Sequence, residues 1–184
     1  LITHTPAFTD ETQEFLLDCV EMALDGAVPE NDGLPEAFTT SALQFHILCQ
    51  RGRFDAQWAQ RLVQAARRDV ARPTCSTWSD LMLYCRYAAE PLGRAVLQRC
   101  GITGRPDIER ATDSLTAALL VMHLMRRAGS DWREHGRCFL PADWIAEEGG
   151  PREQLVEQHL SPALRRVCLR MLERVGKLLE QAAP

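Results

Sequence analysis

The sequence is poor in lysine, because Lys177 is the only one and every other basic residue is an arginine. Its formal net charge is −4, which argues against a nucleic acid as the main partner. No apolar run approaches the ~18 residues that a membrane-spanning helix requires, and no signal peptide is recognisable. We therefore expect a cytoplasmic protein, either free or attached peripherally to a membrane.

Segments that alternate between polar and apolar residues and are rich in β-branched side chains are also lacking, which excludes a sheet-based fold. The 7 cysteines stand singly, without any Cys-x-x-Cys pair. This pattern is typical of buried thiols in a reducing compartment. His135 and Cys138 are the only local beginning of a zinc site, and two ligands do not make one.

What the sequence does contain is helical periodicity, over a length of 184 residues that suits one domain covering 1–184. Neither an internal repeat nor a second-domain linker is present. The spacing predicts an all-α fold of six or seven helices. They are expected at about 10–25, 36–50, 55–70, 76–99, 107–129, 142–148 and from Pro162, after the N-cap Ser161, to the end. Residues 130–141 are expected to form an irregular loop.

The chain is organised around the stretch 67–101, RRDVARPTCSTWSDLMLYCRYAAEPLGRAVLQRCG. Ser76 is the expected N-cap of a helix that carries Asp80 in its first turn. Further along, Pro91 and Gly93 cost roughly 3 and 1 kcal/mol in a helix interior. A helix that keeps both residues has a tertiary reason for them, such as a bend that lines a cavity or a close helix approach.

The line from Tyr84 to Gly93 follows the pattern Tyr-Cys-x-Tyr-x-Ala-x-x-Val-Gly, with Leu92 in place of Val. Upstream, Asp69-Val70, Thr77-Trp78 and Asp80-Leu81 keep the matching spacing, and residues 136–141, GRCFLP, are close to Gly-Arg-x-Tyr-Leu-Pro. In these motifs the chain resembles the squalene/phytoene synthase family, whose members join two prenyl diphosphates head to head. The resemblance extends from about Thr39 to the end.

This resemblance implies an isoprenoid synthase-like helical bundle around a central cavity that holds prenyl tails. It also implies Mg²⁺ ions, bound by two aspartate-rich helical motifs, that bridge to the diphosphate. By family position, Tyr84 and Tyr87 would lie near the reacting carbons and Asp131 would be a metal ligand. The expected substrate contacts are Arg126, Arg127, Arg137 and Gly93.

The aspartate-rich motifs depart from the family pattern. The first, Asp-Asp-x-x-Asp, is absent and either was cut off before Leu1 or never existed; we expect the chain to be incomplete at its N-terminus, and leave its C-terminus open. In the second motif, Leu120, His123 and Arg127 replace the Gln, Asn and first Asp, and only Asp131 keeps its type. A guanidinium cannot ligate Mg²⁺, but it can bind a diphosphate through paired hydrogen bonds. Before the central helix, Thr74-Cys75 replaces an Arg-Tyr pair.

Two functional classes therefore stay open. The chain is either part of a prenyltransferase that binds a prenyl diphosphate or another isoprenoid, or a non-catalytic relative that keeps the scaffold for binding or for assembly with a protein partner. Whether it is an enzyme is undecided at this point.

Each candidate residue also has a plain structural interpretation. The tyrosines can be core residues, Asp69 and Asp131 solvated helix-end charges, His123 a core histidine, and Arg126, Arg127 and Arg133 a solvated face. Two geometric expectations separate these interpretations. Tyr84, Ala88 and Leu92 should line a buried apolar cavity opposite Leu119 or Met122, and Arg127 should pair with Asp131 at i, i+4.

Overall fold

The structure, a computed structural model, describes residues 8–27, 36–71, 74–157 and 159–183, with the side chains of 36–38 left out. The described residues form helices joined by short connections, which confirms the all-α prediction. The elements are α1 (Asp10–Leu24), α2 (Glu36–Gln50), α3 (Gln57–Ala71), α4 (Trp78–Ala88), α5 (Glu90–Arg99), α6 (Pro106–His135), α7 (Ala142–Glu147), the 3₁₀ helix η2 (Arg152–Val156) and α8 (Pro162–Ala182).

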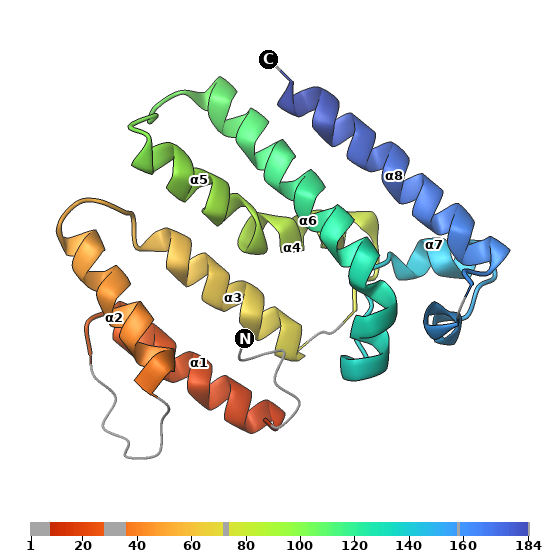
Figure 1. Ribbon diagram of the computed structural model, residues 1–184, viewed down its shortest axis with the longest axis horizontal. Coiled ribbons are helices and arrows are strands. Elements are labelled where there is room, and N and C mark those ends of the chain that lie inside the picture. The colour runs from red at the N-terminus through yellow and green to blue at the C-terminus, as the bar shows by residue number, and fades with distance from the viewer. Residues whose placement is uncertain (1–7, 28–35, 72–73, 158, 184) are drawn as a thin grey trace.

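Helices that follow one another in the chain are not always neighbours in space (Figure 1). Helix α1 packs on α2 and α3, α3 packs on α4 and α5, and α6 lies between these two and α8. Helix α7 and η2 cover one end of the α6–α8 pair. Among the described residues, no helix is both long and apolar enough to cross a bilayer.

Helix α4 begins one residue later than the sequence predicts, because its N-cap is Thr77 and not Ser76. The Thr77 hydroxyl accepts a hydrogen bond from the Asp80 amide at 3.1 Å, and the Asp80 carboxylate accepts one from the Thr77 amide at 3.2 Å. This reciprocal pair is a capping box. A capping box satisfies two otherwise unpaired amides, whereas Ser76 as cap would satisfy one.

The predicted central helix is in fact two helices, since the chain changes direction at Ala89 (φ −113°, ψ −49°). The break removes the expected cost of Pro91, which falls in the first turn of α5, where a missing amide hydrogen has no intrahelical acceptor to lose. As a result, Tyr84 and Leu92 lie on different helices and do not share a face.

The end of α6 was also predicted wrongly, because the helix passes through Gly129 and continues to His135. A Cβ at Gly129 would lie 2.6 Å from the Leu155 carbonyl oxygen, so this glycine lets the backbone of η2 approach. The helix ends at Gly136, whose φ of 62° is left-handed. Residues 130–135, predicted as a loop, therefore extend α6 by more than a turn.

The buried side chains form two clusters. The larger joins α4 to α8 and includes Leu81, Val121, Leu140, Leu164 and Met171. The smaller holds α1, α2 and α3 together through residues such as Leu17, Ala42 and Val63. A parallel bridge between Thr74 and Cys138 fixes the segment before α4 against the segment after α6. This bridge brings residues 136–141 next to the start of α4, the first of the two helices that carry the segment from Tyr84 to Gly93.

Candidate functional site

An apolar groove runs between α5 and α6. It has a volume of about 620 Å³, and its walls include Leu92, Gly93 and Val96 from α5 and Leu115, Leu119 and Leu120 from α6. The two helices approach closely at Gly93, where a Cβ would lie 2.6 Å from the Thr112 methyl and 2.8 Å from the Thr116 methyl. Large aliphatic side chains therefore stand on either side of a narrow floor.

The groove is open, which corrects the expectation of a buried cavity. Leu92 and Leu119 are each 56% exposed. Ala88, Leu92 and Leu119 do line one hollow, as expected, but Met122 is not among its lining residues and Tyr84 faces a different cavity. The break at Ala89 is the physical reason, because it turns Tyr84 away from the face that carries Leu92.

A buried polar cluster lies where α3, α4 and the end of α6 meet. The Tyr84 hydroxyl donates to Asp69 Oδ2 at 3.3 Å, and the Tyr84 ring packs on Phe139 with centroids 4.9 Å apart. Asp69, Asp131 and Arg137 are 8%, 3% and 5% exposed. Asp69 Oδ1 and Arg137 Nη1 have no hydrogen-bond partner within the part of the chain that the structure describes. The solvated interpretation of Asp69 and Asp131 is therefore wrong.

Burial dominates the electrostatics of this cluster. Desolvation raises the pKa of Asp69 to about 6, although the hydrogen bond from Tyr84 and the positive charge of Arg137 act in the opposite direction. The negative charge of Asp131 adds to the increase. Burial and the neighbouring Asp69 carboxylate also raise the pKa of Tyr84, so this phenol stays protonated. Tyr84 can serve as a hydrogen-bond donor and not as a base.

Arg127 and Asp131 form the expected i, i+4 pair. Arg127 donates from Nε at 3.1 Å and from Nη2 at 2.9 Å, and both bonds go to Asp131 Oδ1. The carboxylate that the resemblance assigns to Mg²⁺ thus already has a cationic partner, which repels a second cation. In the described ranges, no three His, Cys, Asp or Glu side chains gather in a way that could hold a metal ion. The Asp131 carboxylate therefore has an arginine as its partner, and within the described residues no third zinc ligand joins His135 and Cys138.

The remaining predicted site residues differ in how far their side chains are exposed. Tyr87 is half-buried, with the Arg68 guanidinium 4.9 Å from the centre of its ring. Gly93 lies in the floor of the groove. Arg126 and Arg133 are exposed on α6, as is His123, so the prediction of a core histidine there is wrong. Helix α6 exposes one side, at Leu115, Leu119 and Met122.

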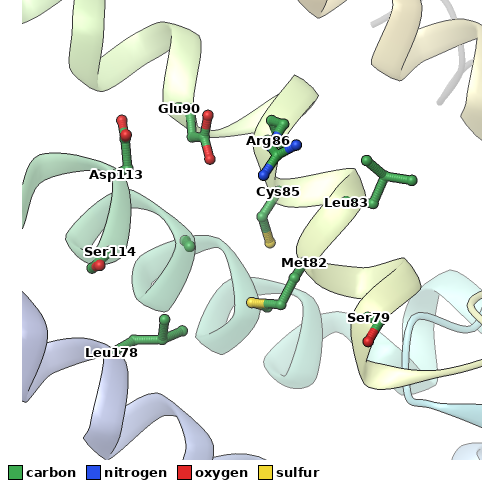
Figure 2. A pocket seen from close by; sticks show the side chains of 10 residues that line it. Ser79, Met82, Leu83, Cys85, Arg86, Glu90, Asp113, Ser114 and Leu178 are labelled. Carbon is green, nitrogen blue, oxygen red and sulfur yellow. The ribbon is translucent and has the colours of Figure 1, made fainter. Parts of the chain in front are cut away.

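A separate hollow, of about 400 Å³, lies between α4, the start of α5, α6 and α8 (Figure 2). Met82, Cys85 and Leu178 point into it, and Glu90 lies between Asp113 and Arg86 in this view. Burial, then the nearby charge of Asp113, raises the pKa of Glu90. Sequence reasoning missed this hollow, because its residues come from four helices and follow no common motif. The signal for the groove was available, since Thr112, Leu115, Thr116 and Leu119 keep helical spacing.

Comparison with known proteins gives a consistent result. The family model described as squalene/phytoene synthase matches residues 3–184. A hydroxysqualene synthase from Rhodopseudomonas palustris is 32% identical over 137 residues, which cover 74% of this chain and 46% of that protein. A 15-cis-phytoene synthase from Enterobacter agglomerans is 36% identical over 105 residues, covering 57% of this chain and 35% of that protein.

Solved structures agree with the sequence comparison. The crystal structure of squalene synthase HpnC from Alicyclobacillus acidocaldarius superposes with a TM-score of 0.68 at 27% identity, covering 94% of this chain and 60% of that one. A dehydrosqualene synthase in complex with ligand gives a TM-score of 0.71 at 21% identity, covering 94% and 59%. The isoprenoid synthase-like fold is thereby confirmed, and the chain aligns with less than two thirds of each of these relatives.

Proposed function

Because the chain belongs to the squalene/phytoene synthase family, we propose that it binds a prenyl diphosphate, with the tail in the α5–α6 groove and the diphosphate beside Arg126 and Arg127. The groove is the observation that supports this proposal most directly. Its walls are aliphatic on both helices, and burying such surface contributes roughly 25 cal/mol per Å². An isoprenoid tail is a ligand of matching shape and polarity.

The position that we propose for the diphosphate follows from the direction in which α6 runs. Leu120 borders the groove, and Arg127 follows seven residues later, which is about 10 Å along a helix. Arg126 is exposed, and the Arg127 side chain remains 38% exposed beside Asp131. Guanidinium groups suit the oxygen atoms of a diphosphate because they donate paired hydrogen bonds.

The metal site of this chain is proposed to be degenerate. Arg127 stands where the family has the first carboxylate of the second motif, and its Nη2 donates a hydrogen bond to Asp131 Oδ1. Mg²⁺, when bound by relatives of this family, would stabilise the negative charge of the departing diphosphate. Arginines that bind the diphosphate equally before and during ionisation would not accelerate it. We therefore expect binding without Mg²⁺-dependent turnover from the chain as given.

A non-catalytic binding or assembly module is the second candidate function. The Arg127–Asp131 ion pair favours this candidate, because the remaining carboxylate of the motif binds a side chain of the protein. This candidate differs from the first in that the scaffold serves binding or assembly with a protein partner and not isoprenoid biosynthesis.

Calorimetry with farnesyl diphosphate and geranylgeranyl diphosphate, in Mg²⁺ and in EDTA, tests the binding proposal. We expect saturable binding whose Kd changes by less than about threefold between the two conditions. The same mixtures are assayed for diphosphate release. Turnover that needs Mg²⁺ and disappears in Asp131→Ala would contradict the degenerate metal site.

A restoring variant sharpens this test. Arg127→Asp recreates carboxylates at i and i+4, so Mg²⁺ should strengthen diphosphate binding in this variant and not in the unaltered chain. Arg126→Asp is the matched control, since it adds the same charge one residue away, where no carboxylate follows at i+4. A Mg²⁺ response of equal size in both variants would show that added charge alone is responsible.

A further inference from the structure

The groove continues into a second hollow. This hollow, of about 600 Å³, lies between the start of α6 and the end of α8, and is lined by Ile108 and Ala111 from α6 and Ala182 from α8. Its lining shares two residues with the groove, Thr112 and Leu115. Any elongated ligand that passes from the groove into the second hollow must therefore pass these two side chains.

The two side chains differ in their freedom to move. The Thr112 methyl faces Gly93 so closely that a Cβ there would be 2.6 Å away, which holds Thr112 in the α5–α6 contact. Leu115 is 42% exposed and stands on the rim. Leu115 is therefore the side chain whose size can change the passage without disturbing the packing of the two helices.

Helix geometry relates this passage to the length of a tail. Arg127 and Leu115 are twelve residues apart, or about 18 Å along α6, and Ile108 lies about 28 Å from Arg127. An extended isoprene unit, with four bonds of roughly 1.5 Å, advances about 5 Å. Three units starting beside Arg127 reach about 15 Å and end before Leu115, whereas four units reach about 20 Å and extend beyond it.

We propose that Leu115 sets the length of the prenyl tail by controlling passage of a fourth isoprene unit from the groove into the second hollow. This inference rests on the proposed function, since it requires the tail to lie along α6. It assigns a specificity-determining role to a residue outside the motifs of the sequence. The second hollow, whose lining includes Ile108 and Gln181, receives the end of the longer tail.

The experiment measures Kd for farnesyl and geranylgeranyl diphosphate on the unaltered chain, Leu115→Trp, Leu115→Ala and the control Leu169→Ala. Leu169 is an exposed leucine of α8, away from both hollows. Leu115→Trp should weaken geranylgeranyl binding about tenfold, the scale of discrimination that apolar pockets reach, and farnesyl binding less than about threefold. Leu115→Ala should shift the ratio the other way, and Leu169→Ala should leave it unchanged.

The outcomes separate the two proposals. If neither diphosphate binds the unaltered chain, the proposed function fails and the role of Leu115 fails with it. If both bind but the Leu115 variants change both Kd values in parallel, the binding function stands and the role of Leu115 is overturned. Circular dichroism of each variant confirms the fold, and Leu115→Phe provides a smaller enlargement should Leu115→Trp unfold.

Discussion

At the scale of single residues, Asp69 is the most consequential ionisable group. It lies at the end of α3, is 8% exposed, and has Oδ1 unpartnered within the described residues. Its pKa of about 6 lies above the ordinary value of 3.8. The folded state therefore binds this proton more tightly than the unfolded state, and the free energy of unfolding falls as pH rises through this window.

Asp69→Asn should remove that dependence. A pKa increase from 3.8 to about 6 corresponds to roughly 3 kcal/mol lost between about pH 4 and pH 6.5. At pH 7 we expect the variant to be more stable by about 1–2 kcal/mol, less than the full amount because Arg137 loses an opposite charge. Urea denaturation between pH 4 and pH 7.5 measures the difference, with the exposed Asp25→Asn as control. A variant that is less stable at pH 7, with an unchanged pH slope, would contradict the assignment.

At the scale of helices, Gly93 determines how closely α5 approaches α6. Gly93→Ala should lower the free energy of unfolding by about 1–3 kcal/mol, because its Cβ would meet the Thr112 and Thr116 methyls at 2.6 and 2.8 Å. This loss outweighs the ~1 kcal/mol that alanine gains in helix propensity. Thermal denaturation measures the change, and adding Thr112→Ser and Thr116→Ser should restore stability by removing both methyls.

Gly176 in α8 provides the matched control for this substitution. No atom lies within 4 Å of a Cβ built there, so Gly176→Ala should raise stability by up to ~1 kcal/mol. Equal effects at Gly93 and Gly176 would mean that propensity, and not the α5–α6 contact, determines the result.

The sequence predicted those features that depend only on residues close together in the chain. The start of α8 follows from Ser161 and Pro162, and the Arg127–Asp131 pair follows from i, i+4 spacing. The place of Gly129 inside α6 was not predictable in the same way, since the group that requires a glycine there is a carbonyl in η2, 26 residues later. The bond from Tyr84 to Asp69 likewise depends on how α3 meets α4. The open face of α6 does not follow from its sequence either, because a helix that is apolar nearly all round is usually buried.

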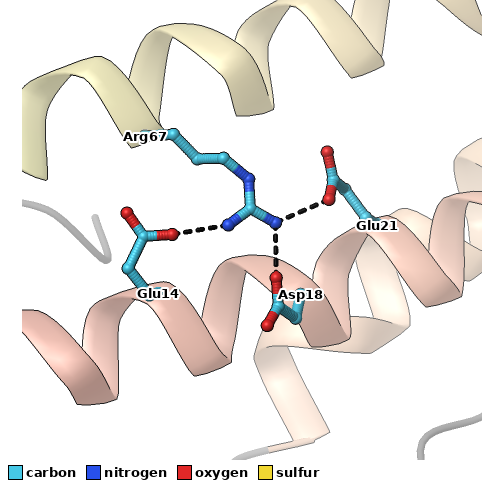
Figure 3. A network of polar contacts seen from close by, with 4 residues as sticks. All are labelled: Glu14, Asp18, Glu21 and Arg67. Atoms are coloured by element: carbon cyan, nitrogen blue, oxygen red, sulfur yellow. Dashed lines mark hydrogen bonds and ion pairs between the residues drawn. The ribbon is translucent and has the colours of Figure 1, made fainter. Parts of the chain in front are cut away.

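At the scale of the whole molecule, the two buried clusters are joined chiefly through α3. Helix α1 packs mainly on α2 and α3, so its attachment depends on a small set of contacts. Arg67 of α3 supplies several of them at once, since it pairs with Glu14 at 2.5 Å and with Asp18 and Glu21 at 2.6 Å (Figure 3). The three carboxylates lie along one side of α1 at i, i+4 and i+7.

Arg67→Met should therefore loosen the α1–α2 part of the molecule and leave α8 unaffected. The carboxylates are 39–62% exposed, so we expect a modest loss of about 1 kcal/mol in the opening free energy of α1, reduced further by salt. Hydrogen exchange measures this directly, because amides of α1 should exchange several-fold faster while those of α8 keep their rates. Arg165→Met on α8 removes the same charge at an exposed position and should leave α1 unchanged. A uniform acceleration across α1 and α8 would mean that the molecule opens as one unit and that Arg67 acts on global stability.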